Sequence, residues 1–201
     1  KADPSSGAWS IDLSGVSEGA HTYKARATDA AGNSSSASNS VSVTVDTAPP
    51  QTKIDSGPSG PTNDNTPTFT FSASDNLSEA WNLRYSYKVD GSAWSSYSFE
   101  KSVTLGGASG LSDGSHIFYV KARDEAGNEG PAQRSFTVDT TKPMVNSNST
   151  TPLGGGVGRD TDLTATFSEQ MGASTVNTNT FMLYKVNSDG SQTQITDVGS
   201  A

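Results

Sequence analysis

The sequence contains no cysteine, so no disulfide framework can hold this chain together. Apolar residues are also scarce, at 31% of 201 residues, and no apolar run is long enough to cross a bilayer. The first residues, Lys1-Ala2-Asp3, show no signal-peptide pattern. We therefore expect a mature or internal piece of a larger protein, without membrane insertion, whose sheets depend on an apolar core.

Basic residues are outnumbered, since 13 Lys and Arg stand against 21 Asp and Glu, which gives a net charge of −8 and a pI near 4.6. Nucleic acids and anionic membranes bind basic surfaces, so neither is an expected partner. An acidic surface favours solubility and the binding of divalent cations.

One stretch occurs twice and organises the chain. The first copy covers residues 21–33 and 41–47, and the second covers residues 116–128 and 135–140. Both contain Asp-x-Ala-Gly-Asn and end at an Asp-Thr exit. The spacing between the copies suits whole β domains in tandem, because solenoid units run over roughly 20–50 residues.

Each copy predicts a β-hairpin, because its residues alternate with period two. In the second copy Phe118, Val120 and Ala122 share one side, and Lys121 and Arg123 share the other. The glycine of the Asp-x-Ala-Gly-Asn segment can adopt positive φ, and its aspartate can accept hydrogen bonds from the amides of the turn.

The repeat resembles the bacterial Ig-like domains that occur in tandem in cell-surface adhesins. The matching residues are Asp29 to Asn33 with Val45 to Pro49, and Asp124 to Asn128 with Val138 to Pro143. The resemblance covers about the first two thirds of the chain. It implies an all-β fold of tandem Ig-like sandwiches at the cell surface or outside the cell. It says less about function, because such modules decorate adhesins, surface layers and secreted enzymes alike.

Three domains follow from this division. Residues 1–48 supply about three strands where an Ig-like sandwich needs about seven, so they are expected to be the C-terminal part of a domain. Residues 49–141 form a complete domain, whose predicted strands include 68–73 and 83–89 with a tight turn at Asp90-Gly91.

The last part, residues 142–201, does not repeat the unit. It has a predicted strand at 163–167, then Phe-Ser-Glu-x-Met at 167–171 and a Thr-Val-Asn-Thr segment near 175–178. This pattern resembles a second Ig-like family found in surface-layer proteins, which implies the N-terminal part of a domain of that type.

Calcium at the domain junctions is the sharpest chemical hypothesis, because Ca²⁺ takes six to eight oxygen ligands. At the first junction, residues of the first copy would face Asp64 or Asp75; at the second, residues of the second copy would face Asp160 or Asp162. The candidate ligands are Asp29, Asn33, Asp46, Asp64, Asp124, Asn128, Asp139 and Asp160. The alternative is that each turn aspartate only caps its own backbone. No other cofactor is expected.

Catalysis finds no support in the sequence. His21 and His116 occupy equivalent places in the two copies, which indicates a structural role. No Gly-x-Ser-x-Gly elbow is present, and the Gly-rich segment 154–158 lacks the Lys-Ser/Thr of a phosphate-binding loop. We expect no enzyme activity.

The expected function is a structural stalk or spacer of a large bacterial surface or secreted protein, an adhesin, with neighbouring Ig-like domains of the same polypeptide as partners. Cell-surface glycans or proteins are further candidate partners. The alternative is a carbohydrate-binding accessory module of a secreted polysaccharide-degrading enzyme. Its candidate sugar-binding residues are Trp81, Trp94, Tyr97 and Tyr119. The competing interpretation is that Trp81 and Trp94 fill the core of the sandwich.

Overall fold

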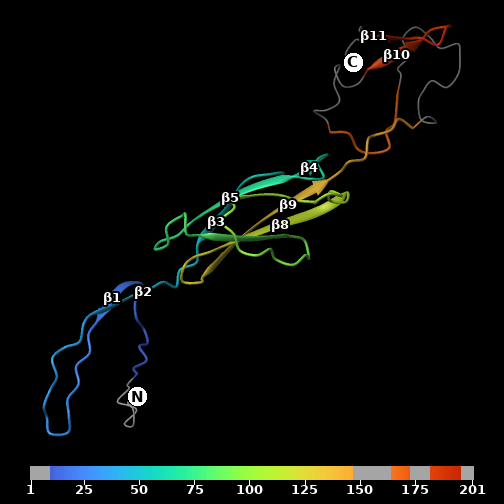
Figure 1. The fold of residues 1–201 in the computed structure, drawn as a ribbon. Helices are drawn as coiled ribbons and strands as arrows, with labels where there is room; N and C mark the ends of the chain where they lie inside the picture. The colour runs from blue at the N-terminus through green and yellow to red at the C-terminus, as the bar shows by residue number, and fades with distance from the viewer. Residues whose placement is uncertain (1–9, 147–163, 173–181, 196–201) are drawn as a thin grey trace. The chain divides into compact units, whose positions relative to one another are not determined.

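The computed structural model describes residues 10–146, 164–172 and 182–195, and those residues form strands and loops without a helix (Figure 1). No helix in these ranges could therefore span a membrane. The chain divides into two compact units, residues 1–140 and 141–201. The predicted all-β fold is confirmed.

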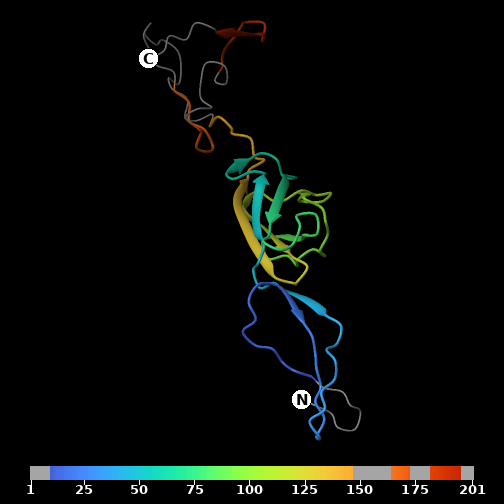
Figure 2. The same ribbon diagram turned by 90° about the vertical axis from the view of Figure 1, so that its left-hand side faces the viewer.

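Residues 51–138 form a sandwich of two sheets, which lie face to face (Figure 2). One sheet has the strand order β3-β5-β7, and the other has the order β4-β9-β8-β6. The strands are β3 (Gln51–Ser56), β4 (Pro61–Thr62), β5 (Thr68–Ser74), β6 (Arg84–Val89), β7 (Ser102–Thr104), β8 (Gly114–Arg123) and β9 (Glu129–Val138). All pairings are antiparallel except that of β4 with β9.

The core of the sandwich follows from the alternation within the strands. Phe118, Val120 and Ala122 of β8 are fully buried, as the repeat predicts. From the facing sheet, the ring of Phe69 stacks on Phe118 with their centroids 4.3 Å apart, and it lies 5.4 Å from Phe136 of β9. Burying a large apolar side chain contributes about 1.5–3 kcal/mol, so aromatic packing replaces the missing disulfides.

The competing interpretation of the two tryptophans is wrong, since neither fills this core. Trp81 is 71% exposed and Trp94 is 39% exposed. The core space is taken by smaller rings from β5, β8 and β9 together with Leu83 and Tyr85. Trp94 belongs to a segment that pairs irregularly with β6, through bonds such as Ser95 N–H to the Tyr87 carbonyl at 2.9 Å.

The first copy of the repeat forms the two-stranded hairpin β1 (Gly19–Tyr23) and β2 (Val41–Val45). Beyond Tyr23 the ladder becomes irregular, and serine hydroxyls accept from backbone amides, as Ser38 Oγ does from Ala25 N at 2.9 Å. The apolar side chains of this hairpin, including Val41 and Val43, remain exposed. The expectation that residues 1–48 are the C-terminal part of a domain stays a prediction.

Both copies also share a clamp at the Asp-Thr exit. The Glu18 carboxylate accepts from the amide and hydroxyl of Thr47, and the Asp113 carboxylate accepts from the same two groups of Thr140. Each acid directly precedes the glycine that begins the first strand of its hairpin, so the clamp ties the start of one strand to the end of the other.

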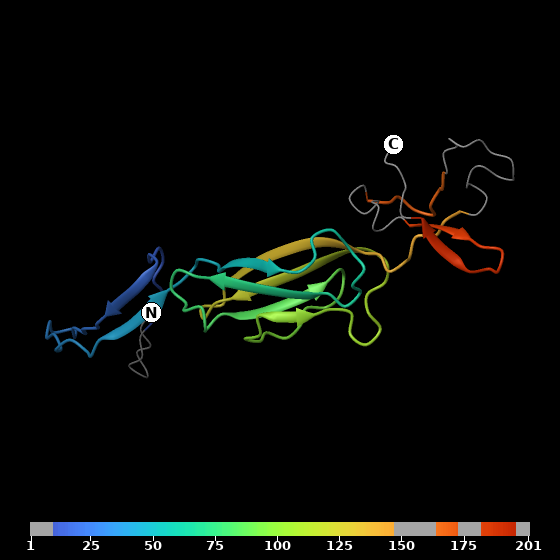
Figure 3. The same ribbon diagram turned by 90° about the horizontal axis from the view of Figure 1, so that it is seen from above.

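In the second unit, β10 (Leu183–Val186) and β11 (Gln192–Ile195) pair as an antiparallel hairpin, drawn in red in Figure 3. The sequence reasoning did not identify this hairpin, although Asp189-Gly190 forms its turn with Gly190 at φ 80°. The strand predicted at 163–167 is represented by one antiparallel bridge between Val145 and Phe167. Leu163, Asp160, Asp162 and the Gly-rich segment lie outside the described residues.

The turn at Asp90 contains a titratable pair that should make stability depend on pH. His116 is buried, its Nδ1 lies 2.8 Å from the Asp90 carboxylate, and its Nε2 lies 2.8 Å from the Ser112 carbonyl. These two hydrogen bonds outweigh burial and raise the pKa of His116 above 6.5. Burial acts to raise the pKa of Asp90, but bonds from His116 and the Ile117 amide outweigh it and lower that pKa below 3.8.

We predict that the pair stabilises the sandwich most between these values. The His116 contribution is fully present below pH 6.5 and is lost as pH rises through its raised pKa. The Asp90 contribution is present above pH 3.8 and is lost as pH falls through its lowered pKa. In urea unfolding of the native chain, the free energy of unfolding should fall by on the order of 1 kcal/mol between pH 5 and pH 9. In His116→Gln this fall should be smaller. His21→Gln, at the equivalent place in the first copy, should leave this fall in unfolding free energy unchanged. If His116→Gln showed the same pH dependence as the native chain, the His116–Asp90 pair would not be its source.

A second prediction concerns Gly130, where β9 begins against the linker. A Cβ atom there would overlap the carbonyl oxygen of the buried Pro50, and the Gly130 carbonyl also accepts from the Thr52 hydroxyl at 2.5 Å. Gly130→Ala should therefore cost about 1–3 kcal/mol of unfolding free energy, as overpacking does. Gly91→Ala, where no atom lies within 4 Å of the added carbon, should cost less than about 0.5 kcal/mol. Equal denaturation midpoints for both variants would contradict this packing.

Candidate metal centre

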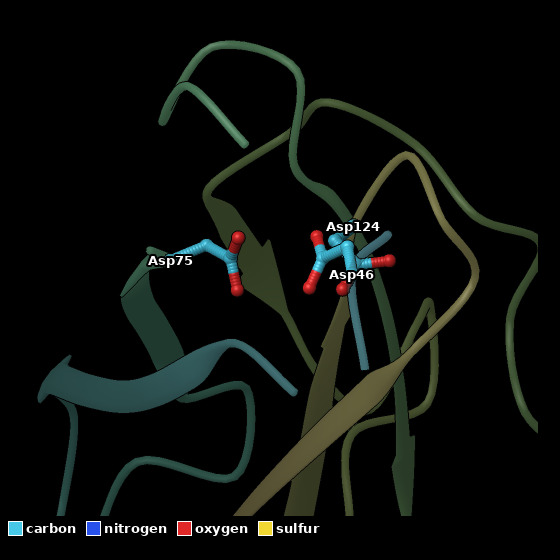
Figure 4. A group of neighbouring side chains, drawn as sticks. All are labelled: Asp46, Asp75 and Asp124. Carbon is cyan, nitrogen blue, oxygen red and sulfur yellow. The ribbon is translucent and has the colours of Figure 1, made fainter. Parts of the chain in front are cut away.

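Three aspartates meet where the first hairpin leads into the sandwich. Asp46 follows β2, Asp75 follows β5 and Asp124 follows β8. One carboxylate oxygen of each lies within 4.8 Å of the other two, and the three side chains converge in Figure 4. Asp124 is buried, and Asp46 and Asp75 are partly buried.

Asp124 is held in place by its own turn. Its Oδ1 accepts from the amides of Gly127 and Asn128 at 2.6 and 2.8 Å, and its Oδ2 accepts from Asn128 Nδ2 at 2.8 Å. Gly127 adopts φ 102°, which a residue with a side chain rarely tolerates. The predicted capping of the turn is therefore confirmed, and it also fixes the direction of the carboxylate.

The two carboxylate oxygens of Asp75 differ in their hydrogen bonding. Its Oδ1 accepts from the amides of Leu77 and Ser78 at 3.0 and 2.8 Å. Its Oδ2 is buried and has no hydrogen-bond partner within the described ranges. A buried, unpaired carboxylate oxygen is costly, and a cation beside it would remove that cost.

Asp46 connects the cluster to the segment before the sandwich. Its side chain accepts from the Ala48 amide at 3.2 Å, and its backbone carbonyl accepts from Asn128 Nδ2 at 3.1 Å. Burial is the main cause that raises the pKa of Asp46, and the neighbouring carboxylates of Asp75 and Asp124 add to it. Three acids this close repel one another, so the cluster is a place where positive charge is stabilising.

The ligand chemistry fits a hard divalent cation. Ca²⁺ binds oxygen ligands at about 2.3–2.6 Å, so two of its ligand atoms lie at most roughly 5 Å apart. The three oxygens within 4.8 Å of one another meet that limit. No histidine or cysteine belongs to the cluster, which disfavours zinc and other softer metals.

The structure brings together part of the predicted ligand set. The predicted grouping is wrong, because Asp46 was assigned to the first junction and Asp124 and Asn128 to the second. The structure instead places Asp46 and Asp124 in one cluster, and Asn128 supports both through its amide. Asp75 was weighed at this junction but stood outside the main set. Its only signal in the sequence is its place directly after a strongly alternating strand.

The other predicted ligands lie elsewhere. Asp29 and Asn33 bond to each other in the turn of the first hairpin, with Asn33 Nδ2 donating to Asp29 at 2.9 Å. The Asp64 carboxylate accepts from the amide and hydroxyl of Thr66. Asp139 follows β9, at the opposite end of its hairpin from Asp124. Asp160 is outside the described ranges.

Of the four candidate sugar-binding residues, three lie together and one, Trp81, lies apart from them. Trp81 stands in the loop before β6, largely exposed. Trp94, Tyr97 and Tyr119 gather around lysines of the β6–β8 pair: Lys121 Nζ lies 4.8 Å from the Trp94 ring centroid, and Lys88 Nζ lies 4.8 Å from that of Tyr119. The outward direction predicted for Tyr119 agrees with its pairing opposite Lys88.

Comparison with known proteins gives the family. The model of the bacterial Ig-like domain matches residues 2–47 and 51–140. No protein of curated function matches the chain. Among solved structures, the chain is similar to the fibronectin(III)-like modules of CbhA from Clostridium thermocellum, at 22% identity and a TM-score of 0.40. That similarity covers 63% of this chain and 65% of the other, which is less than two thirds of its length. Since both copies of the repeat fall within matched segments, the chain belongs to the family of bacterial Ig-like domains.

Proposed function

We propose that this chain is a non-catalytic spacer of a large bacterial surface or secreted protein, an adhesin, and that Ca²⁺ stiffens the junction before its central sandwich. Modules of this family are typically non-catalytic and commonly occur in extracellular proteins. The observation that carries the proposal is the cluster of Asp46, Asp75 and Asp124, because its members come from both sides of the linker.

The linker itself already restricts the chain. Pro49 and Pro50 fix their φ angles and provide no amide donor, and Pro50 is fully buried. Thr47 is held by the Glu18 carboxylate, and Thr52 donates to the Gly130 carbonyl. At this cluster, Asn128 Nδ2 donates to the Asp46 carbonyl and so joins the two sides of the linker directly.

A bound cation would replace repulsion by attraction at this point. Without it, three carboxylates oppose one another and the Asp75 oxygen stays unpaired. With it, the segment after β2 would share an ion with the loops after β5 and β8.

The second candidate function is a carbohydrate-binding accessory module of a secreted polysaccharide-degrading enzyme. One observation favours it: Trp94 and Phe99 expose aromatic rings on the outer side of the sandwich, at 39% and 56% exposure. Exposed aromatic rings of this kind suit stacking against sugar rings.

The spacer proposal predicts that the difference in melting temperature between Asp75→Asn and the native chain changes sign when Ca²⁺ replaces EDTA. The variant keeps the oxygen that accepts from Leu77 and Ser78 but removes one negative charge. In EDTA it should melt at a higher temperature than the native chain, because the repulsion is reduced. In Ca²⁺ the order should reverse, because saturating the native site at about 100 times Kd adds about 2.7 kcal/mol.

Calorimetric titration with Ca²⁺ should show binding by the native chain that Asp75→Asn weakens at least about tenfold, the loss of roughly 1.4 kcal/mol. Asp64→Asn removes an equal charge outside the cluster and should behave like the native chain. If Ca²⁺ raised the melting temperature of Asp75→Asn as much as that of the native chain, the cluster would not be the cation site.

A further inference from the structure

The outer face of the β6–β8 pair collects positive charge. The register places Arg84 opposite Arg123, Ser86 opposite Lys121 and Lys88 opposite Tyr119. Because side chains alternate across a strand, these residues share one face, while Tyr85 and Val120 point into the core. Four cations therefore lie on one small surface of a chain whose net charge is −8.

Aromatic rings lie under every one of these cations. Arg84 Cζ is 5.0 Å from the Phe99 ring centroid, and Arg123 Cζ is 4.4 Å from that of Tyr97. Lys121 Nζ contacts Trp94 and Tyr97, and Lys88 Nζ contacts Trp94 and Tyr119. We call this surface the cation–aromatic strip; it comprises Arg84, Lys88, Trp94, Tyr97, Phe99, Tyr119, Lys121 and Arg123.

Carboxylates balance only part of the positive charge of the strip. Lys121 pairs with the Glu129 carboxylate at 2.7 Å, and Glu129 also accepts from the Tyr97 hydroxyl. Across the described ranges, Arg84, Lys88 and Arg123 form no ion pair with a carboxylate. Arg123 lies opposite Glu129 in the β8–β9 register, and these two opposite charges attract each other. Arg84 and Lys88 contact aromatic rings and form no ion pair within those ranges, so an external anion can approach them.

The strip ends in a cavity at the two arginines. Its volume is about 360 Å³, and it is lined by Asn82, Arg84, Phe99, Arg123, Asp124 and Glu125. The lining residues carry guanidinium, phenyl, amide and carboxylate groups. Such a set can pair with a carboxylate and also hydrogen-bond to hydroxyl groups.

We infer that the strip binds an acidic polysaccharide, one whose sugar rings carry carboxylates. The rings of Trp94 and Phe99 would stack on the apolar faces of the sugars, and Arg84 and Arg123 would pair with the carboxylates. Lys121 and Arg123 are two residues apart on one strand, about 7 Å, so a chain lying along β8 meets charge repeatedly. This inference rests on the second candidate function and names its ligand class; the spacer role does not depend on it.

Nucleic acid is the less fitting polyanion. Proteins that bind it carry a strongly basic domain, with a pI above about 9, whereas this chain has a pI near 4.6. The closely spaced phosphates of a strand would meet the overall negative charge. A uronic acid polymer carries its charges on rings that can also stack, which suits a strip with few cations and many rings.

The test is calorimetric titration of the full chain with a galacturonate oligomer, in EDTA so that Ca²⁺ cannot bridge the two. We expect binding that weakens with salt and falls at least tenfold in the double variant Arg84→Gln/Arg123→Gln and in Trp94→Ala. Lys53→Gln, which removes an exposed charge from the other sheet, should bind as the native chain does. Urea unfolding of each variant checks that the sandwich persists.

Four results would overturn the inference: no uronate binding, equal binding by Arg84→Gln/Arg123→Gln, tighter binding of an oligo-dT strand, or equal binding of a neutral oligosaccharide. A neutral oligosaccharide of the same length should bind at least tenfold more weakly. If it bound equally well, the acidic ligand class would be wrong while the accessory-module function remained. If no sugar bound at all, the acidic ligand class and the accessory-module function would both be wrong. The proposal of Ca²⁺ at the junction would be unaffected, because it is tested separately.

Discussion

The length of a β-hairpin separates its turn from its exit, and this separation decides where the acidic residues of the repeat can meet. β8 and β9 are ten residues long, which separates the turn at Asp124 from the exit at Asp139 by about 33 Å. The turn and exit of one copy therefore cannot share an ion. The exit of the first copy, Asp46, instead meets the turn of the second, so the candidate metal centre depends on the head-to-tail order of the repeats.

The two-residue alternation of β8 accounts for the two surfaces of the sandwich. One parity supplies Phe118 and Val120 to a core that has no disulfide to assist it. The other supplies Lys121 and Arg123 to the cation–aromatic strip. A register slip by one residue would bury the cations and expose the core rings, so the same strand pairing sets both the core and the cation–aromatic strip.

Much of the fold could be predicted from the sequence because its signals are local. Alternation placed Phe69, Phe71 and Phe118 inside, and the Asp-x-Ala-Gly-Asn pattern indicated both turns and the side-chain bonds of Asp29 and Asp124. The tryptophans were harder, since their size suggests burial but only three-dimensional packing shows that phenylalanines fill the core. Asp75 was underweighted for a similar reason: its nearness to Asp46 and Asp124 is set by loops remote in sequence.

The central claim is that a cation joins the two sides of the linker, and a distance distribution tests it most directly. The absence of native cysteine allows spin labels at Ser42→Cys on β2 and Lys101→Cys in the sandwich. Pulsed electron resonance should then give a broad distribution in EDTA and a narrower one in Ca²⁺, with the narrowing absent in Asp75→Asn. Equal widths in EDTA and in saturating Ca²⁺ would contradict the claim.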